Sequence, residues 1–132
     1  MIGLRDSRLK GKTVRERARV LVVEDEVLLA ETLVGLLEDG GFSPAGPART
    51  VAGAMDLIET AAVDAAILDI RLFQELSYQV AYALRDRGIP FVFVTACGRR
   101  DLPADLRSRP FVEKPFPPRA LLHTLRTVLP AR

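Results

Sequence analysis

Five polar side chains in this sequence stand at the ends of short apolar runs. They are Glu24, Asp25, Asp69, Thr95 and Lys114. An uninterrupted apolar run is typical of a strand that is buried on both faces of a parallel sheet. The carboxyl ends of parallel strands meet at one edge of the sheet, where open α/β sheets bind their ligands. We therefore expect these side chains to lie close together although the sequence separates them widely.

The chemistry that suits this set is phosphoryl transfer to a carboxylate. Three carboxylates in one pocket would repel one another unless a cation compensates their charge. Mg²⁺ prefers a few carboxylates together with water and a phosphoryl oxygen, so Glu24, Asp25 and Asp69 are candidate metal ligands. Asp69 is the candidate nucleophile, with Lys114 and Thr95 placed to contact phosphoryl oxygens. Any one of these residues could simply mark where a strand meets solvent, so the prediction depends on their joint pattern.

The segments that would position these residues alternate between strands and helices. The predicted strands are 20–23, 42–48, 65–68, 91–94 and 111–112. The intervening segments carry apolar residues at helical spacing, except for the fourth. Short connections between parallel strands require right-handed crossovers. The alternation therefore predicts an open α/β sheet with helices on both faces.

Several residues indicate where these elements begin and end. Thr50 and Ser77 are predicted helix caps, and Gly40-Gly41 is predicted to end the first helix. Pro117-Pro118 is predicted to open the last helix, because proline is tolerated in a first turn. Two prolines in segment 42–48 confine that strand to an edge of the sheet.

Two connections are predicted to be irregular. Residues 97–109 are polar and contain glycine and proline, so at most one short helical turn is expected there, around 101–106. Residues 71–75, which follow Asp69 closely, are predicted to form a polar loop. Within that loop, Phe73 could be an anchor packed inward or an exposed contact, and we favour the anchor.

The composition predicts one globular domain in the cytoplasm. The 132 residues are 48% hydrophobic and 27% charged, which is ordinary for one folded domain. No apolar run approaches the roughly 20 residues that would span a bilayer, and the basic N-terminus does not resemble a secretory signal. A single cysteine, Cys97, allows no internal disulfide bond.

The charge is distributed unevenly along the chain. Residues 1–19 hold seven Lys or Arg and only two acidic residues, whereas the net charge of the whole chain is +2. We interpret residues 1–18 as a basic, flexible extension and residues 19–132 as the folded domain. The extension has neither aromatic residues nor a groove-reading motif, so nucleic-acid binding is not expected.

The sequence resembles the CheY-like receiver domains of two-component response regulators, from about residue 19 to the last helix. The stretches that carry the resemblance are Val20–Glu26, Ile67–Ile70, Val94–Ala96 and Glu113–Phe116. The resemblance implies a flavodoxin-like (βα)5 doubly wound parallel sheet of order 2-1-3-4-5. It also implies that a histidine kinase transfers a phosphoryl group from its phosphohistidine to Asp69.

The resemblance further implies roles for individual residues. The implied magnesium ligands are Asp25, Asp69, the backbone carbonyl of Arg71 and, through water, Glu24. Thr95 and Lys114 take the positions of the family's switch hydroxyl and lysine, and Phe111 takes that of its aromatic switch. A cis peptide bond is expected between Lys114 and Pro115.

A narrower resemblance concerns segment 90–98, which is similar to the signature of the FAT GUY receivers, a subgroup of stand-alone domains. Val94, Ala96 and Cys97 depart from that signature. The subgroup has a poorly formed fourth helix, in agreement with the polar stretch after Cys97. We predict that Gly98–Arg109 is the most mobile ordered segment, and that Cys97 plays a small, buried apolar role and not a redox role.

A stand-alone receiver would act by protein contact or as a phosphate relay or sink, with homodimerisation left open. Such a protein catalyses only its own phosphorylation and dephosphorylation. The rival readings are an aspartate-nucleophile phosphatase and a pseudo-receiver that binds partners without phosphorylation. The phosphatase would need a carboxylate two residues after Asp69, where this chain has Arg71.

Arg71 borders the expected path of the attacking water, which predicts a long-lived phosphorylated state. The only histidine, His123, is predicted to be a surface residue and not the phosphodonor.

Overall fold

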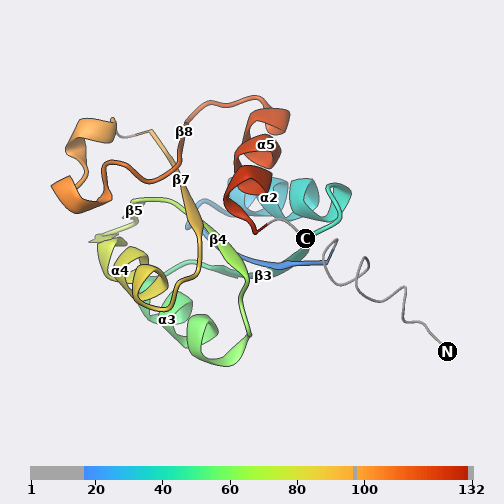
Figure 1. Ribbon diagram of the computed structural model, residues 1–132, viewed down its shortest axis with the longest axis horizontal. Helices are drawn as coiled ribbons and strands as arrows, with labels where there is room; N and C mark the ends of the chain where they lie inside the picture. The colour runs from blue at the N-terminus through green and yellow to red at the C-terminus, as the bar shows by residue number, and fades with distance from the viewer. Residues whose placement is uncertain (1–16, 97, 131–132) are drawn as a thin grey trace, which may run out of the picture.

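The computed structural model describes residues 17–96 and 98–130, and in them five strands form one parallel sheet (Figure 1). Along the chain these strands are β2 (Arg19–Val23), β3 (Ser43–Ala48), β4 (Ala65–Leu68), β7 (Phe91–Thr95) and β8 (Phe111–Glu113). Their spatial order is β3-β2-β4-β7-β8, and all neighbouring pairs are parallel. Counted along the chain this order is 2-1-3-4-5, so the predicted flavodoxin-like fold is confirmed.

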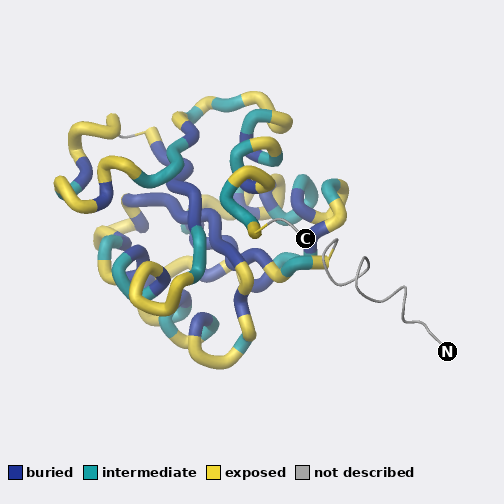
Figure 2. Tube along the Cα trace, viewed as in Figure 1, coloured by how far each residue is buried: buried dark blue, intermediate teal, exposed yellow. Residues whose placement is uncertain are grey.

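Helices cover both faces of the sheet (Figure 1). They are α2 (Val27–Asp39), α3 (Val51–Thr60), α4 (Tyr78–Asp86) and α5 (Pro118–Val128). Successive residues of a strand point to opposite faces. Accordingly, Leu21 and Val23 of β2 pack with α3 and α4, whereas Val20 and Val22 pack with α2 and α5. Both faces of the central strands are therefore buried, as the dark blue centre of Figure 2 shows.

Of the four predicted helix ends, those at Gly40, Thr50 and Pro118 are confirmed and the cap at Ser77 is not. The hydroxyl of Thr50 accepts a hydrogen bond from the N–H of Gly53 at 3.0 Å, and Pro118 is the first residue of α5. Ser77 precedes α4, but its side chain does not cap that helix. Its hydroxyl instead donates to the backbone carbonyl of Asp69, which the fold brings into reach. The expected cis bond at Lys114–Pro115 is present, and Gly46–Pro47 is also cis.

The connection after Asp69 is a small hairpin and not the expected loop. Strands β5 (Arg71–Leu72) and β6 (Glu75–Leu76) pair antiparallel, with Phe73 and Gln74 at the turn. The polar composition concealed this hairpin because Leu72, fully buried, is its only residue in the core. The hairpin thus places its turn beside the carboxyl edge of the main sheet.

The segment before β8 contains two short 3-10 turns, η1 (Arg99–Asp101) and η2 (Ala104–Leu106), where at most one turn was expected. Leu102 and Leu106 are buried in the core that contains α3 and α4. The Arg99 guanidinium donates to the carbonyls of Arg107 and Arg109, at 2.6 and 2.8 Å. These contacts give an irregular segment a defined conformation, and its greater mobility stays a prediction.

Two predictions concern residues outside the described part of the chain. They are the flexibility of most of the extension, residues 1–16, and the role of Cys97. Among the described residues, no helix is long and apolar enough to cross a membrane.

Candidate phosphoacceptor site

The carboxyl edge of the sheet brings together the polar residues that the sequence singled out. Asp69 directly follows β4, and its N–H donates to the carbonyl of Val23 at the end of β2. This contact sets Asp69 beside Glu24, the next residue after β2. Lys114 follows β8, and its N–H donates to the carbonyl of Thr95 at the end of β7. The predicted convergence on this edge is therefore found.

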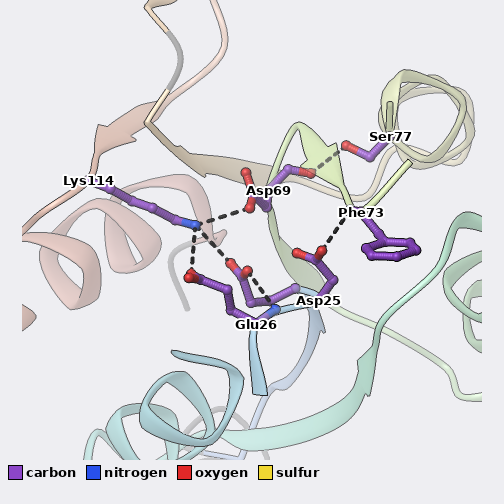
Figure 3. A network of polar contacts seen from close by, with 7 residues as sticks. Asp25, Glu26, Asp69, Phe73, Ser77 and Lys114 are labelled. Carbon is purple, nitrogen blue, oxygen red and sulfur yellow. Dashed lines mark hydrogen bonds and ion pairs between the residues drawn. The ribbon is translucent and has the colours of Figure 1, made fainter. Parts of the chain in front are cut away.

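The Lys114 ammonium bonds to the carboxylates of Asp69, as Figure 3 shows, and of Glu24. Its Nζ lies 3.0 Å from Asp69 Oδ2 and 3.1 Å from Glu24 Oε1. Both acids are buried, with 7% of Asp69 and 1% of Glu24 exposed. Glu26 lies 3.9 Å away, but its side chain is 69% exposed, so water screens that pair.

Burial and charge shift the protonation of this cluster. Burial, and then the charge of Asp69, raise the pKa of Glu24 to about 7, although Lys114 opposes the shift. Burial by itself would lower the pKa of Lys114, but its hydrogen bonds and charge pairing with Asp69 and Glu24 raise it overall. Lys114 therefore stays charged at neutral pH, and the pocket carries more negative charge than this one cation can balance.

The three acids fit a divalent cation. Glu24, Asp25 and Asp69 each offer a carboxylate oxygen, and these oxygens lie within 4.8 Å of one another. Hard oxygen donors in this number suit Mg²⁺, and its double charge would relieve the surplus negative charge. These residues would hold the ion. The part played by the Arg71 carbonyl stays a prediction.

Asp25 has a partner that the sequence did not suggest. Its Oδ2 accepts a hydrogen bond from the backbone N–H of Phe73 at 2.6 Å. The Phe73 backbone has φ of 49°, and the side chain is 80% exposed, with the ring directed away from Asp25 (Figure 3). The prediction that Phe73 is an inward anchor is wrong, because the turn directs its side chain outward and Leu72 fills the core.

The two switch positions are found in different surroundings. Thr95 is buried, with 1% exposed, at the end of β7. Phe111 is partly buried, and the Arg99 guanidinium lies over its ring, 4.9 Å from the centroid. Nothing in the sequence pointed to this contact, because it joins residues of an irregular segment to a strand. Arg71 and His123 are both exposed.

The sequence and the fold both resemble those of known proteins. The sequence matches the response regulator receiver domain family over residues 20–126. The chain belongs to that family. The receiver domain is 39% identical to SdrG from Sphingomonas melonis Fr1, covering 86% of this chain and 97% of that one with a TM-score of 0.75. It is 26% identical to a response regulator receiver protein from Sinorhizobium medicae WSM419, covering 86% of this chain and 95% of that one with a TM-score of 0.73.

Curated relatives of the receiver domain are longer proteins. The uncharacterized transcriptional regulatory protein YbdJ from Bacillus subtilis is 32% identical over 117 residues, which cover 84% of this chain. The transcriptional regulatory protein DltR from Streptococcus agalactiae is 33% identical over 113 residues, or 82% of this chain. The chain spans about half the length of the curated relatives it matches.

Proposed function

We propose that this receiver domain accepts a phosphoryl group on Asp69 from the phosphohistidine of a histidine kinase, in a reaction that depends on Mg²⁺. The observation that carries the proposal is the buried Asp69 carboxylate, held 3.0 Å from Lys114 Nζ beside two further acids. We place this reaction in the cytoplasm.

In the proposed step an oxygen of the Asp69 carboxylate attacks phosphorus. The P–N bond of the phosphohistidine breaks, and the imidazole nitrogen keeps its electron pair. A magnesium ion held by Glu24, Asp25 and Asp69 would supply charge compensation in the pocket. Lys114, already bonded to Asp69, contacts a phosphoryl oxygen of the product, and the Thr95 hydroxyl donates to another.

Phosphorylation is proposed to act by changing the surface that the protein presents to its partners. The phosphoryl group draws the Thr95 hydroxyl toward Asp69 and Phe111 follows, which shifts the population of conformations around β7, β8 and α5. The altered surface binds a protein partner, or the domain passes the phosphoryl group on. Its only catalysis is its own phosphorylation and dephosphorylation. The exposed Arg71, at the position where a phosphatase would carry its second carboxylate, supports this reading over an enzyme.

Phosphoramidate tests the proposal without a known kinase, because it also donates through a P–N bond. The full chain with phosphoramidate and MgCl₂ should gain the mass of one phosphoryl group. The gain should be lost in Asp69→Asn and with EDTA. It should persist in Asp56→Asn, which neutralises an exposed acid on α3. A folded wild-type protein that gains no mass, or a gain that survives Asp69→Asn, would overturn the proposal.

A further inference from the structure

The hairpin β5–β6 has an unusual residue at its turn. Phe73 adopts a left-handed backbone conformation with φ of 49°, which bulky L-residues rarely adopt. Its ring gains little from packing, because 80% of the side chain is exposed. The positive φ belongs to the two-residue turn that joins β5 to β6, because the favoured turns of such hairpins have a positive φ at their first residue.

Several hydrogen bonds hold the hairpin in place. At its base, the Ser77 hydroxyl donates to the Asp69 carbonyl, and the Ser77 N–H donates to the Ile70 carbonyl at 2.8 Å. On its second strand, Glu75 Oε2 accepts from the N–H of Val51 at the start of α3, at 3.0 Å. At the turn, the Phe73 N–H donates to Asp25 Oδ2 at 2.6 Å. The turn that has a positive φ at Phe73 therefore also places the Phe73 N–H against Asp25.

We propose that the Phe73 N–H is a positioning donor for Asp25 in the metal site, so that hairpin closure and Mg²⁺ binding stabilise each other. The hydrogen bond engages Oδ2 and so restrains the orientation of the Asp25 carboxylate. Partners in the outer shell of a metal site commonly orient its ligands in this way. The inference rests on the metal site of the proposed function but not on phosphoryl transfer.

The coupling has a consequence in each direction. If the closed hairpin favours Mg²⁺, then Mg²⁺ must favour the closed hairpin by the same factor. Because the same turn carries the exposed Phe73 ring, occupancy of the acidic pocket determines how firmly that ring is held at the protein surface.

Substitutions at residue 73 test this proposal, because each keeps the backbone N–H and changes only how readily the residue adopts a positive φ. Glycine and asparagine adopt the left-handed conformation readily, alanine does so less easily, and β-branched valine resists it most. We expect calorimetric Mg²⁺ titration of the full chain to give Kd values for Phe73→Gly and Phe73→Asn no weaker than wild type. Phe73→Ala should resemble wild type, and Phe73→Val should bind more weakly, by up to about tenfold.

The neighbouring residue provides a matched control. Gln74 is exposed and lies in the same turn without a positive φ, so Gln74→Val should leave the Kd unchanged. Circular dichroism must show that each variant is folded. As a second measurement, Mg²⁺ should slow hydrogen exchange of the residue 73 amide in the wild-type protein. That slowing should be smaller in Phe73→Val.

Each contrary result has a definite meaning. Equal Kd values for Phe73→Gly and Phe73→Val would overturn the inference, as would tighter binding by Phe73→Val, since the N–H would then compete with the cation. Wild-type protein that binds no Mg²⁺ would overturn both the inference and the metal dependence of the proposed function. If wild type binds Mg²⁺ with the expected order among variants but phosphoramidate fails to label Asp69, only phosphoryl transfer is overturned.

Discussion

Lys114 Nζ lies 3.0 Å from Asp69 Oδ2, so the cation contributed by β8 is bonded to the acid at the end of β4. The same ammonium contacts Glu24 at 3.1 Å, and its side chain is only 19% exposed. One positive charge is therefore fixed inside a pocket that also suits a metal ion. Its removal must change how strongly the pocket attracts a second cation.

Lys114→Gln should bind Mg²⁺ about tenfold more tightly than wild type. Repulsion between a unit charge and a divalent ion a few Å apart is on the order of 2 kcal/mol even at high dielectric constant. Calorimetric titration would measure the two Kd values. The matched control is Arg119→Gln, which removes one positive charge from the exposed first turn of α5 and should change the Kd little. Unchanged affinity in Lys114→Gln would show that the ammonium does not repel the metal.

Arg99→Ala should loosen the segment between β7 and β8. The substitution removes two hydrogen bonds to the carbonyls of Arg107 and Arg109 and the stacking on Phe111. We expect the free energy of unfolding to fall by about 1 kcal/mol and amide exchange around Leu102 and Leu106 to accelerate.

Chemical denaturation and hydrogen exchange would measure both effects. Arg100→Ala is the control, because Arg100 is the exposed neighbour in η1 and contributes only its backbone carbonyl to this network. Equal exchange rates in the two variants would contradict a role for the Arg99 side chain in holding the segment.

Arg71→Asn should shorten the lifetime of the phosphorylated state. Arg71 lies two residues after Asp69 and is exposed beside the pocket, where its guanidinium can pair with phosphoryl oxygens or obstruct a water molecule. We expect several-fold faster loss of the phosphoryl group after the donor is removed, followed by intact mass. Arg71→Lys keeps the charge but not the planar guanidinium, so its rate of phosphoryl loss should lie between those of wild type and Arg71→Asn. An unchanged rate in Arg71→Asn would exclude this role.

The sheet and the acidic edge were predictable because both follow from local patterns. The apolar runs Val20–Val23 and Ala65–Leu68 identify strands buried on both faces, and parallel topology then brings Glu24, Asp25 and Asp69 to one edge. The cap at Thr50 depends only on the next three residues, so it was predictable too.

The features that sequence reasoning missed depend on contacts between distant residues. Phe73 turns outward at the tip of the hairpin β5–β6, and its N–H bonds to Asp25, 48 residues earlier in the chain. The Ser77 hydroxyl donates to the Asp69 carbonyl and does not cap α4, because a buried hydroxyl bonds the acceptor that the fold brings to it. Arg99 reaches Phe111 only because the intervening segment folds back on itself. No periodicity in the sequence reports such contacts.

Phosphorylation of Asp69 can be tested by locating the phosphoryl group on the chain. The full chain is treated with phosphoramidate and MgCl₂ and digested under mild conditions, and tandem mass spectrometry then assigns the modified residue. We expect a single acyl phosphate on Asp69, absent when Mg²⁺ is chelated. A phosphoryl group found on His123, on a serine or threonine, or on another acid while Asp69 stays unmodified would contradict it.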